Sequence, residues 1–385
     1  MTKKNDDDAP DAPPVLRGDD AVALWQQGRD AWNDWIAAHP GAEIDFGGVD
    51  FTPHRTKGEK LSFTGFHFGD GYVDFEDATF GDGDVYFINT EFGDSIVDFK
   101  GAAFGDGGVF FWGATFGDGI VDFSDASVDR LTFDPRTFES RSLDCSSLIV
   151  KSAAHFDLSV ATDKLAHVSF RNAVFVGPFT LDGVLSAPPD LRGTKADHHV
   201  DLSDLRASLR RQPPKRAWPP ILSRTVPDHK NAVADAARFR RLKELAEANR
   251  DHAAALRFAA YENRAKRWHE TGWFASVLDM AFSGFSDYGQ SIWRPAAGLV
   301  VLTAIAAVLY RAVTDWGCWA DAISLAAGNA VAFLPQSRAV RADAVDALFG
   351  PDPGTWIDLA ILAQAALSFV FLFLIGLGLR NRFRL

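Results

Sequence analysis

The sequence predicts a β-solenoid followed by a helical transmembrane domain. The first observation is a ladder of phenylalanines whose spacing alternates between five and seven residues and so repeats every twelve. The second is a pair of apolar runs near the C-terminus, each close to the length that crosses a bilayer. A strict short repeat indicates stacked copies of one unit that bury each other's apolar faces. The ladder consists of Phe63, Phe68, Phe75, Phe80, Phe87, Phe92, Phe99, Phe104, Phe111, Phe116 and Phe123.

Within each unit, a small or branched residue lies two positions before a phenylalanine, as Val73 does before Phe75. Residues two apart on an extended strand face the same side, so each pair points inward. Gly-Asp-Gly or Gly-Asp-Ser corners separate the pairs, where glycine permits a tight turn. Alternate units match better than neighbours, which predicts two units, 24 residues, per coil. Asp74, Asp98 and Asp122 should then form an acidic column with steps of roughly 4.8 Å that faces solvent or a cation.

The unit resembles the pentapeptide-repeat family, in which a small residue and a polar residue precede leucine or phenylalanine. Ala-Thr-Phe at 78–80 and 114–116 fits that pattern, as does Val-Asp-Phe at 73–75, 97–99 and 121–123. The resemblance implies a right-handed quadrilateral β-solenoid. A two-residue insertion at every second corner departs from the family, so its coil geometry carries over only approximately. A β-meander of twelve-residue hairpins is the alternative fold.

The ends of the solenoid need covering, because an open edge strand invites pairing with other chains. We expect a disordered acidic and Pro/Ala-rich tail at 1–18, a capping helix at 19–40 and the solenoid at 41–186. Leu24, Trp25, Ala31, Trp32 and Trp35 fall roughly on one helical face. A packed cap explains these aromatic residues more simply than a ligand cage does.

Residues 187–228 are predicted to be a proline-rich linker. The stretch Asp197-His198-His199-Val200-Asp201 suits no particular metal geometry, so a solvated loop is preferred to a metal site. A helical hairpin is predicted at 229–270 and an interfacial segment at 271–291. The hairpin is basic, and its Arg264, Lys266 and Arg267 either form a solvated helical face or lie beside anionic headgroups.

The remainder, 292–385, is predicted to be a two-span transmembrane domain with spans at about 295–313 and 357–379. Basic residues before the first span and Arg380, Arg382 and Arg384 after the second place both termini and the solenoid in the cytoplasm. A buried two-helix core of a soluble protein is the alternative. It is disfavoured because no nearby segment is large enough to cover the second run.

The loop between the spans predicts a re-entrant helix at about 321–335. Two spans with such a helix resemble the pore module of two-helix ion channels. The potassium-selective threonine-valine-glycine-tyrosine-glycine sequence is absent, so potassium selectivity is not supported. Polar groups in or near the membrane are the candidates for lining a pore. They are Ser324, Gly328, Asn329, Gln364 and Ser368.

The whole chain resembles bacterial pentapeptide-repeat membrane proteins, which combine a Trp-rich first helix, a solenoid, a helical linker and a two-span, channel-like tail. The matching stretches are 31–35, 239–243, 286–291 and 379–384. The resemblance implies location in a bacterial inner membrane. It carries no established substrate.

Several classes of function are disfavoured by composition and motifs. A formal net charge of −12 argues against binding nucleic acid through its phosphates. Cys145 and Cys318 lie far apart, so neither a disulfide framework nor a zinc cluster is expected. No nucleophile elbow, phosphate loop or metal motif is found, so we predict neither an enzyme nor a cofactor.

Three functional hypotheses follow. The first is a homo-oligomeric channel-like pore with a cytoplasmic solenoid that senses, gates or docks a partner, with stress or phage defence as a speculative role. Several subunits are required, because two helices cannot enclose a water path. The second is a membrane-tethered scaffold that binds a protein partner through the acidic face. The third is a DNA mimic that inhibits a topoisomerase, which the membrane tail disfavours.

Overall fold

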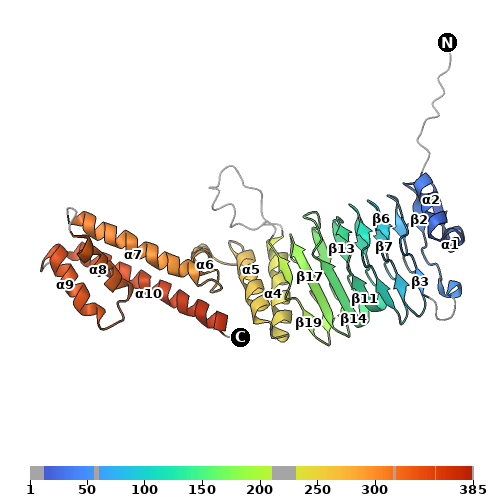
Figure 1. The fold of residues 1–385 in the computed structure, drawn as a ribbon. Helices are drawn as coiled ribbons and strands as arrows, with labels where there is room; N and C mark the ends of the chain where they lie inside the picture. The colour runs from blue at the N-terminus through green and yellow to red at the C-terminus, as the bar shows by residue number, and fades with distance from the viewer. Residues whose placement is uncertain (1–12, 56–59, 210–230, 315–317, 352, 384–385) are drawn as a thin grey trace, which may run out of the picture. The chain divides into compact units, whose positions relative to one another are not determined.

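The computed structural model describes residues 13–55, 60–209, 231–314, 318–351 and 353–383. The chain divides into two compact units, Met1–His269 and Glu270–Leu385. The first unit is a stack of parallel β-strands with helices at both ends, here called the β-stack, and the second is helical (Figure 1).

The strands of the first unit form three parallel sheets. In the repeat region each sheet collects the equivalent strand of every second twelve-residue unit, so paired strands come from different copies of the unit. The first sheet contains β1 (Val15–Arg17), β2 (Glu43–Asp45), β4 (Val73–Asp74), β7 (Ile96–Asp98), β10 (Ile120–Asp122), β13 (Ser142–Asp144) and β15 (His167–Ser169). The second contains β3 (Leu61–Ser62), β5 (Val85–Tyr86), β8 (Gly108–Phe110), β11 (Ser127–Phe133), β14 (Ile149–Leu158), β16 (Val174–Phe175), β17 (Phe179–Leu185), β18 (Lys195–Ala196), β19 (Val200–Asp201) and β20 (Leu205–Ala207). The third contains β6 (Glu91–Phe92), β9 (Thr115–Phe116) and β12 (Thr137–Phe138), and a short 3-10 helix spans Thr52–His54.

The phenylalanine ladder is the core of the β-stack, and all eleven of its members are buried. Val73 pairs with Val97 and Val97 with Val121, so these strands are in register at a separation of 24 residues. Phenylalanine rings consequently stack on their equivalents 24 residues away. The ring centroids of Phe75 and Phe99 lie 4.9 Å apart and those of Phe99 and Phe123 lie 4.8 Å apart. Aromatic burial is therefore the main stabilising contribution of this unit.

Two helices rather than one cap the N-terminal end of the β-stack. α1 (Gly18–Gln26) and α2 (Arg29–Ala38) are separated at Gly28, whose φ is +96°. The indole of Trp32 is fully buried and donates to the carbonyl of His67 at 2.7 Å. The prediction of disorder as far as residue 18 is wrong at its end, because β1 pairs with β2 and α1 already begins at Gly18. Residues 1–12 of that predicted tail lie outside the described residues.

The β-stack extends beyond its predicted end at residue 186. β18, β19 and β20 continue the second sheet to Ala207, and Leu191 is fully buried. The predicted linker at 187–228 is therefore wrong over its first part, and the rest of it, from residue 210, lies outside the described residues. Pro188 and Pro189 indicated a linker, but here they precede the bridge between Asp190 and Ser169. Proline is tolerated at such a position because no ladder hydrogen bond is needed from it.

The helical hairpin of α4 (Ala232–Ala248) and α5 (His252–Lys266) covers the C-terminal end of the β-stack (Figure 1). Phe239 and Phe258 are buried in the same hydrophobic core as the phenylalanine ladder. Hydrogen bonds also join the hairpin to the last strands of the β-stack. The side chain of Asn249 accepts from the Val200 amide at 2.9 Å, and Arg241 donates to the Thr194 carbonyl at 2.6 Å. The hairpin is therefore a second cap.

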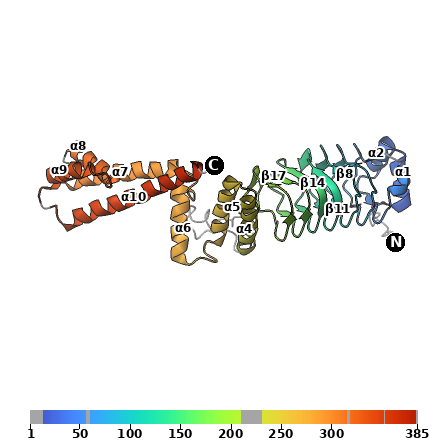
Figure 2. The same ribbon diagram turned by 90° about the horizontal axis from the view of Figure 1, so that it is seen from below.

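The second unit consists of α6 (Trp273–Ser286), α7 (Trp293–Val313), α8 (Trp319–Ala330), α9 (Ser337–Phe349) and α10 (Thr355–Phe383). Figure 2 shows α7 and α10 lying side by side and α6 crossing their direction. The re-entrant helix was predicted at 321–335, but α8 ends at Ala330, and α9 was not predicted.

Helices α7 and α10 are long and apolar enough to cross a membrane. In the most apolar part of each helix only 17% of the residues are buried. A core helix of a soluble protein would be mostly buried, so this exposure disfavours the soluble two-helix core. Large exposed apolar surfaces mark contacts with lipid or with another protein.

Candidate functional site

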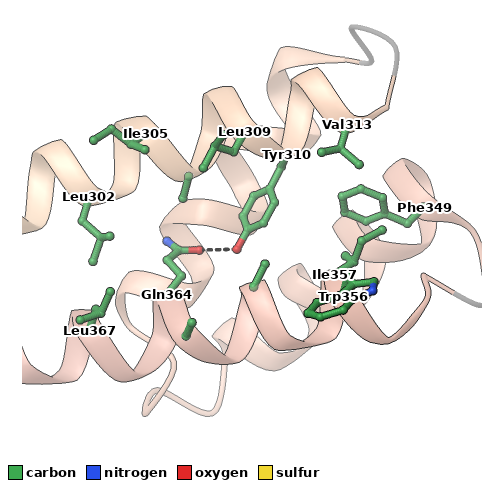
Figure 3. A pocket seen from close by; sticks show the side chains of 13 residues that line it. Leu302, Ile305, Leu309, Tyr310, Val313, Phe349, Trp356, Ile357, Gln364 and Leu367 are labelled. Carbon is green, nitrogen blue, oxygen red and sulfur yellow. Dashed lines mark hydrogen bonds between the residues drawn. The ribbon is translucent and has the colours of Figure 1, made fainter.

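A polar cluster joins α7, α8 and α10 in the interior of the second unit. The Tyr310 hydroxyl donates to Oε1 of Gln364 at 2.8 Å (Figure 3). Nδ2 of Asn329 donates to the same oxygen at 3.0 Å. Nε2 of Gln364 donates to the Ala326 carbonyl at 2.8 Å. Gln364 therefore binds both neighbouring helices at once.

The local sequence explains how this cluster forms. A polar amide within a long apolar helix is stable in a membrane only when it faces protein and is hydrogen-bonded. Small residues on the facing helices let the backbones approach closely enough for these bonds. They are Ala306 and Ala307 on α7 and Ala322 and Ala326 on α8, and all four are buried.

Two buried oxygens near this cluster lack a hydrogen-bond partner among the described residues. They are Oδ1 of Asn329 and Oγ of Ser368, in side chains that are 0% and 1% exposed. Ser368 follows Gln364 by one helical turn on α10 and therefore lies on the same face. The interior thus retains unused capacity to accept a hydrogen bond.

A cavity of about 430 Å³ lies beside the cluster, between α7, α10 and the end of α9 (Figure 3). Tyr310 and Gln364 contribute its hydrogen-bonding groups deep in the helix bundle, and the indole of Trp356 lines it near the start of α10. The other lining residues are apolar, namely Leu302, Ile305, Ala306, Leu309, Val313, Phe349, Ile357, Ala360, Ala363 and Leu367.

The five candidate pore residues are not displayed on the outer surface of the spans. Gln364, Asn329 and Ser368 are buried within the subunit, Gly328 is buried and packs against the side chain of Arg341, and Ser324 is half-buried. Over residues 296–310 and 359–379, every exposed residue is apolar. The assignment of the five candidates as pore-lining residues stays a prediction, and the sequence gave no indication of Tyr310, which binds Gln364 from 54 positions away.

The structure places Asp74, Asp98 and Asp122 in register on adjacent strands, with Asp45 and Asp144 extending the column. Each carboxylate accepts a hydrogen bond from the backbone amide two residues further on, for example Asp122 from Ser124 at 2.7 Å. These five residues, the aspartate column, therefore stabilise the turns of the β-stack. Among the residues that the structure describes, no group of three or more potential ligands could hold a metal ion.

Burial raises the pKa of Asp74 and of Asp122, and the neighbouring carboxylates of the column add to that effect. A carboxyl group with a raised pKa in the folded state stabilises the fold at low pH, and this stabilisation is lost as the pH rises through the folded-state pKa. Asp122→Asn keeps the oxygen that accepts from Ser124 and removes the charge. We expect it to stabilise the β-stack by about 0.5 kcal/mol at pH 7 and by less at pH 4. Chemical denaturation at both pH values, with exposed Asp125→Asn as the control, measures this difference; equal effects at the two pH values would contradict it.

The basic residues predicted at the membrane surface fall into two groups. Arg267 is only 3% exposed, so its assignment to the surface is wrong, and Lys266 forms an ion pair with Glu262. Arg264 lies over the ring of Tyr261 at 5.1 Å. These three residues belong to the hairpin that caps the β-stack. Arg380 and Arg382 are exposed at the end of α10, and Arg384 lies outside the described residues.

An aromatic patch on the outside of the β-stack was missed from the sequence. Its members are Tyr86, Phe110 and Trp112, here called the outer patch. Ring centroids are 5.3 Å apart for Tyr86 and Phe110 and 4.6 Å apart for Phe110 and Trp112. Trp112 remains 43% exposed, and the Lys60 ammonium lies 4.9 Å from the centroid of Tyr86. The run Phe110-Phe111-Trp112 was the available signal, because alternation along a strand directs its first and third residues outward.

Replacing Gln364 with leucine tests the polar cluster. The change removes the shared partner of Tyr310, Asn329 and the Ala326 carbonyl, so we expect the second unit to lose about 1–2 kcal/mol of stability. Unfolding by SDS in mixed micelles, followed by helical circular dichroism, measures the loss. Ala366→Leu, at an exposed apolar position of α10, is the control and should change little. An unchanged or increased stability of Gln364→Leu would show that the hydrogen bonds are not needed.

No family model, curated protein or solved structure matches the chain. Fold and site define its class: a repeat-like stack of parallel β-sheets, capped by helices at both ends, joined to a helical unit with two apolar helices of membrane-spanning length. Function is therefore argued from the geometry alone.

Proposed function

We propose that this chain is an integral protein of a bacterial inner membrane in which α7 and α10 anchor a protein-docking β-solenoid at the cytoplasmic surface. In this proposal the β-stack is a right-handed quadrilateral solenoid of about 24 residues per coil, of the pentapeptide-repeat type. The two-span unit holds the solenoid near the membrane, and the solenoid binds a protein partner.

The orientation of the polar side chains in the spans carries the proposal. Gln364, Asn329 and Tyr310 bind one another inside the subunit, while the exposed residues at 296–310 and 359–379 are all apolar. A helix pair of this kind keeps its polar side chains inside the subunit and presents only apolar side chains to lipid over these residues. This arrangement suits an anchor.

The outer patch supports a docking role for the β-stack. Tryptophan and tyrosine are enriched among the residues that contribute most to protein–protein binding. Trp112 has a large exposed ring held in place by Phe110, so little side-chain entropy is lost when a partner covers it. The aspartate column lies on a different sheet and provides a separate acidic surface.

Proximity labelling from the N-terminus of the full-length protein in cells tests both the anchor role of the two spans and the docking role of the outer patch. Replacing 293–383 with an unrelated two-span hairpin should leave the labelled partner unchanged, because the spans act only as an anchor. Trp112→Ala should abolish labelling of that partner, whereas Val184→Ala, at another exposed apolar position, should not. Loss of the partner on exchanging the spans would contradict the anchor role.

The second candidate function is an oligomeric channel-like pore, in which the solenoid acts as a sensing or gating domain. The unpartnered oxygens of Asn329 and Ser368 favour it, because polar groups inside a membrane protein often mark ion or water pathways. Such a pore requires helices of several subunits to rearrange around an axis and expose these groups. Ion flux through liposomes containing the purified protein, abolished by Asn329→Leu, would support the pore. If a purified oligomer gave no ion flux, the pore function would be ruled out.

A further inference from the structure

The turn between α6 and α7 brings the ends of both spans together. Asn381, near the end of α10, donates to the carbonyl of Gly289 at 3.2 Å. Gly378 packs against Ile292 so closely that a side chain at this position would meet it. The start of α7 and the end of α10 therefore lie at the same end of the second unit (Figure 2).

The backbone of this turn is held in an unusual conformation. Asp287, Tyr288 and Gly289 have consecutive positive φ values of 50°, 57° and 78°. Left-handed backbone at residues other than glycine is unfavourable and persists only where the surroundings enforce it. The hydroxyl of the buried Tyr288 donates to Asp279 on α6 at 2.8 Å and contributes to that enforcement. The backbone of residues 287–289 is therefore held in one conformation.

Three arginines gather at this end. Arg294, the second residue of α7, donates to the Ser283 carbonyl at 3.4 Å and lies 3.7 Å from the carboxylate of Asp287. Arg382 follows Gly378 by one helical turn, on the face that packs against Ile292. Arg380 and Arg382 are exposed and form no ion pair with the residues that the structure describes. The end of the unit thus carries more positive charge than its own acidic residues neutralise.

An apolar surface adjoins these arginines. Trp273, Phe274, Val277, Leu278 and Phe285 of α6 are exposed and recur at helical spacing. Trp293 and Phe383, at the ends of the two spans, are 80% and 76% exposed. Aromatic residues beside arginines at the end of a span are typical of the membrane interface.

We propose that Arg294, Arg380 and Arg382 bind anionic phospholipid headgroups, whose acyl chains lie against α6 and Trp293. This inference rests on the proposed insertion of α7 and α10 into a membrane. Guanidinium groups bind phosphate through paired N–H donors, which accounts for arginine at all three positions. The apolar surface favours a lipid over a free phosphate ion, since only a lipid would contact both the arginines and the apolar surface.

Native mass spectrometry of the full-length protein in detergent tests the site. We expect the protein to retain phosphatidylglycerol in preference to phosphatidylcholine with the same acyl chains. Binding should weaken by about fivefold for each arginine removed, and so by roughly 25-fold in Arg380→Gln/Arg382→Gln. The matched control is Arg338→Gln, which removes an exposed arginine from α9 and should leave retention unchanged.

Three outcomes would overturn the proposal: unchanged retention in the double variant, an equal loss in Arg338→Gln, or displacement of the lipid by millimolar inorganic phosphate. The last result would assign the site to a free phosphate ion. Extraction of membranes at alkaline pH separates this inference from the proposed function. If the protein is extracted, membrane insertion itself fails. If the protein stays and retention is unchanged, only the lipid site fails.

Discussion

Phe99→Ala is expected to destabilise the β-stack by about 3–5 kcal/mol, the usual loss for truncating a fully buried phenylalanine. The Phe99 ring is fully buried and lies between the rings of Phe75 and Phe123, 4.9 and 4.8 Å away. Its removal leaves a cavity that the two neighbouring rings cannot fill, because Phe75 is stacked on Phe46 and Phe123 packs edge-on against Phe111 and Phe133. The variant therefore loses burial and ring contacts on both sides.

Chemical denaturation of the full-length protein, followed by circular dichroism in the β-sheet region, measures this loss. Ile120→Ala is the matched control, because Ile120 is 40% exposed on a neighbouring strand and should change stability by no more than about 0.5 kcal/mol. A loss below 1 kcal/mol for Phe99→Ala would show that the ladder does not dominate the stability of the β-stack.

The phenylalanine ladder could be predicted because a strict repeat determines its own neighbours. Once Phe99 points inward, its equivalents 24 residues away on either side stack on it, and register follows from identical side chains. The same logic predicts the aspartate column. Both inferences need only the spacing of residues along one strand.

The C-terminal end of the β-stack could not be predicted in the same way. Beyond residue 186 the buried core positions include no phenylalanine before residue 208 and are mostly leucine and valine, such as Leu191 and Val200, so the repeat loses its visible period. The capping role of α4 and α5 depends on long-range contacts, among them Asn249 with Val200. From the sequence alone, the basic residues of these helices are equally compatible with contact to anionic lipid headgroups. In the structure, Arg241 instead binds a backbone carbonyl of the β-stack.

The candidate site was predictable in composition and not in geometry. Gln364 and Ser368 are conspicuous in an apolar run, and Asn329 is conspicuous in a short helix between two spans. Which way these side chains face depends on how α7, α8 and α10 pack together, which no local pattern specifies. The small residues on α7 and α8 permit that packing, but small residues are equally compatible with contacts between subunits.

Gly177→Ala is expected to destabilise the β-stack by about 3 kcal/mol, at the upper end for overpacking a core. Gly177 is buried opposite Ser152, and an added Cβ would overlap the Ser152 carbonyl group. Two features prevent relaxation. Pro178 restricts the backbone of the preceding residue to extended conformations. The flanking rings of Phe175 and Phe179 are stacked at 4.0 Å and fix the chain on both sides.

The matched control is Gly41→Ala, because a Cβ at Gly41 meets nothing within 4 Å and the backbone there is not left-handed. This change should be neutral or stabilise by up to about 1 kcal/mol, since alanine restricts the unfolded chain. The two variants are compared by chemical denaturation and by hydrogen exchange of the β14 and β17 amides, which should lose protection only in Gly177→Ala. Equal stability of the two variants would mean that the backbone between β16 and β17 can shift to admit a side chain. The close contact between neighbouring strands at this corner would then not constrain the sequence there.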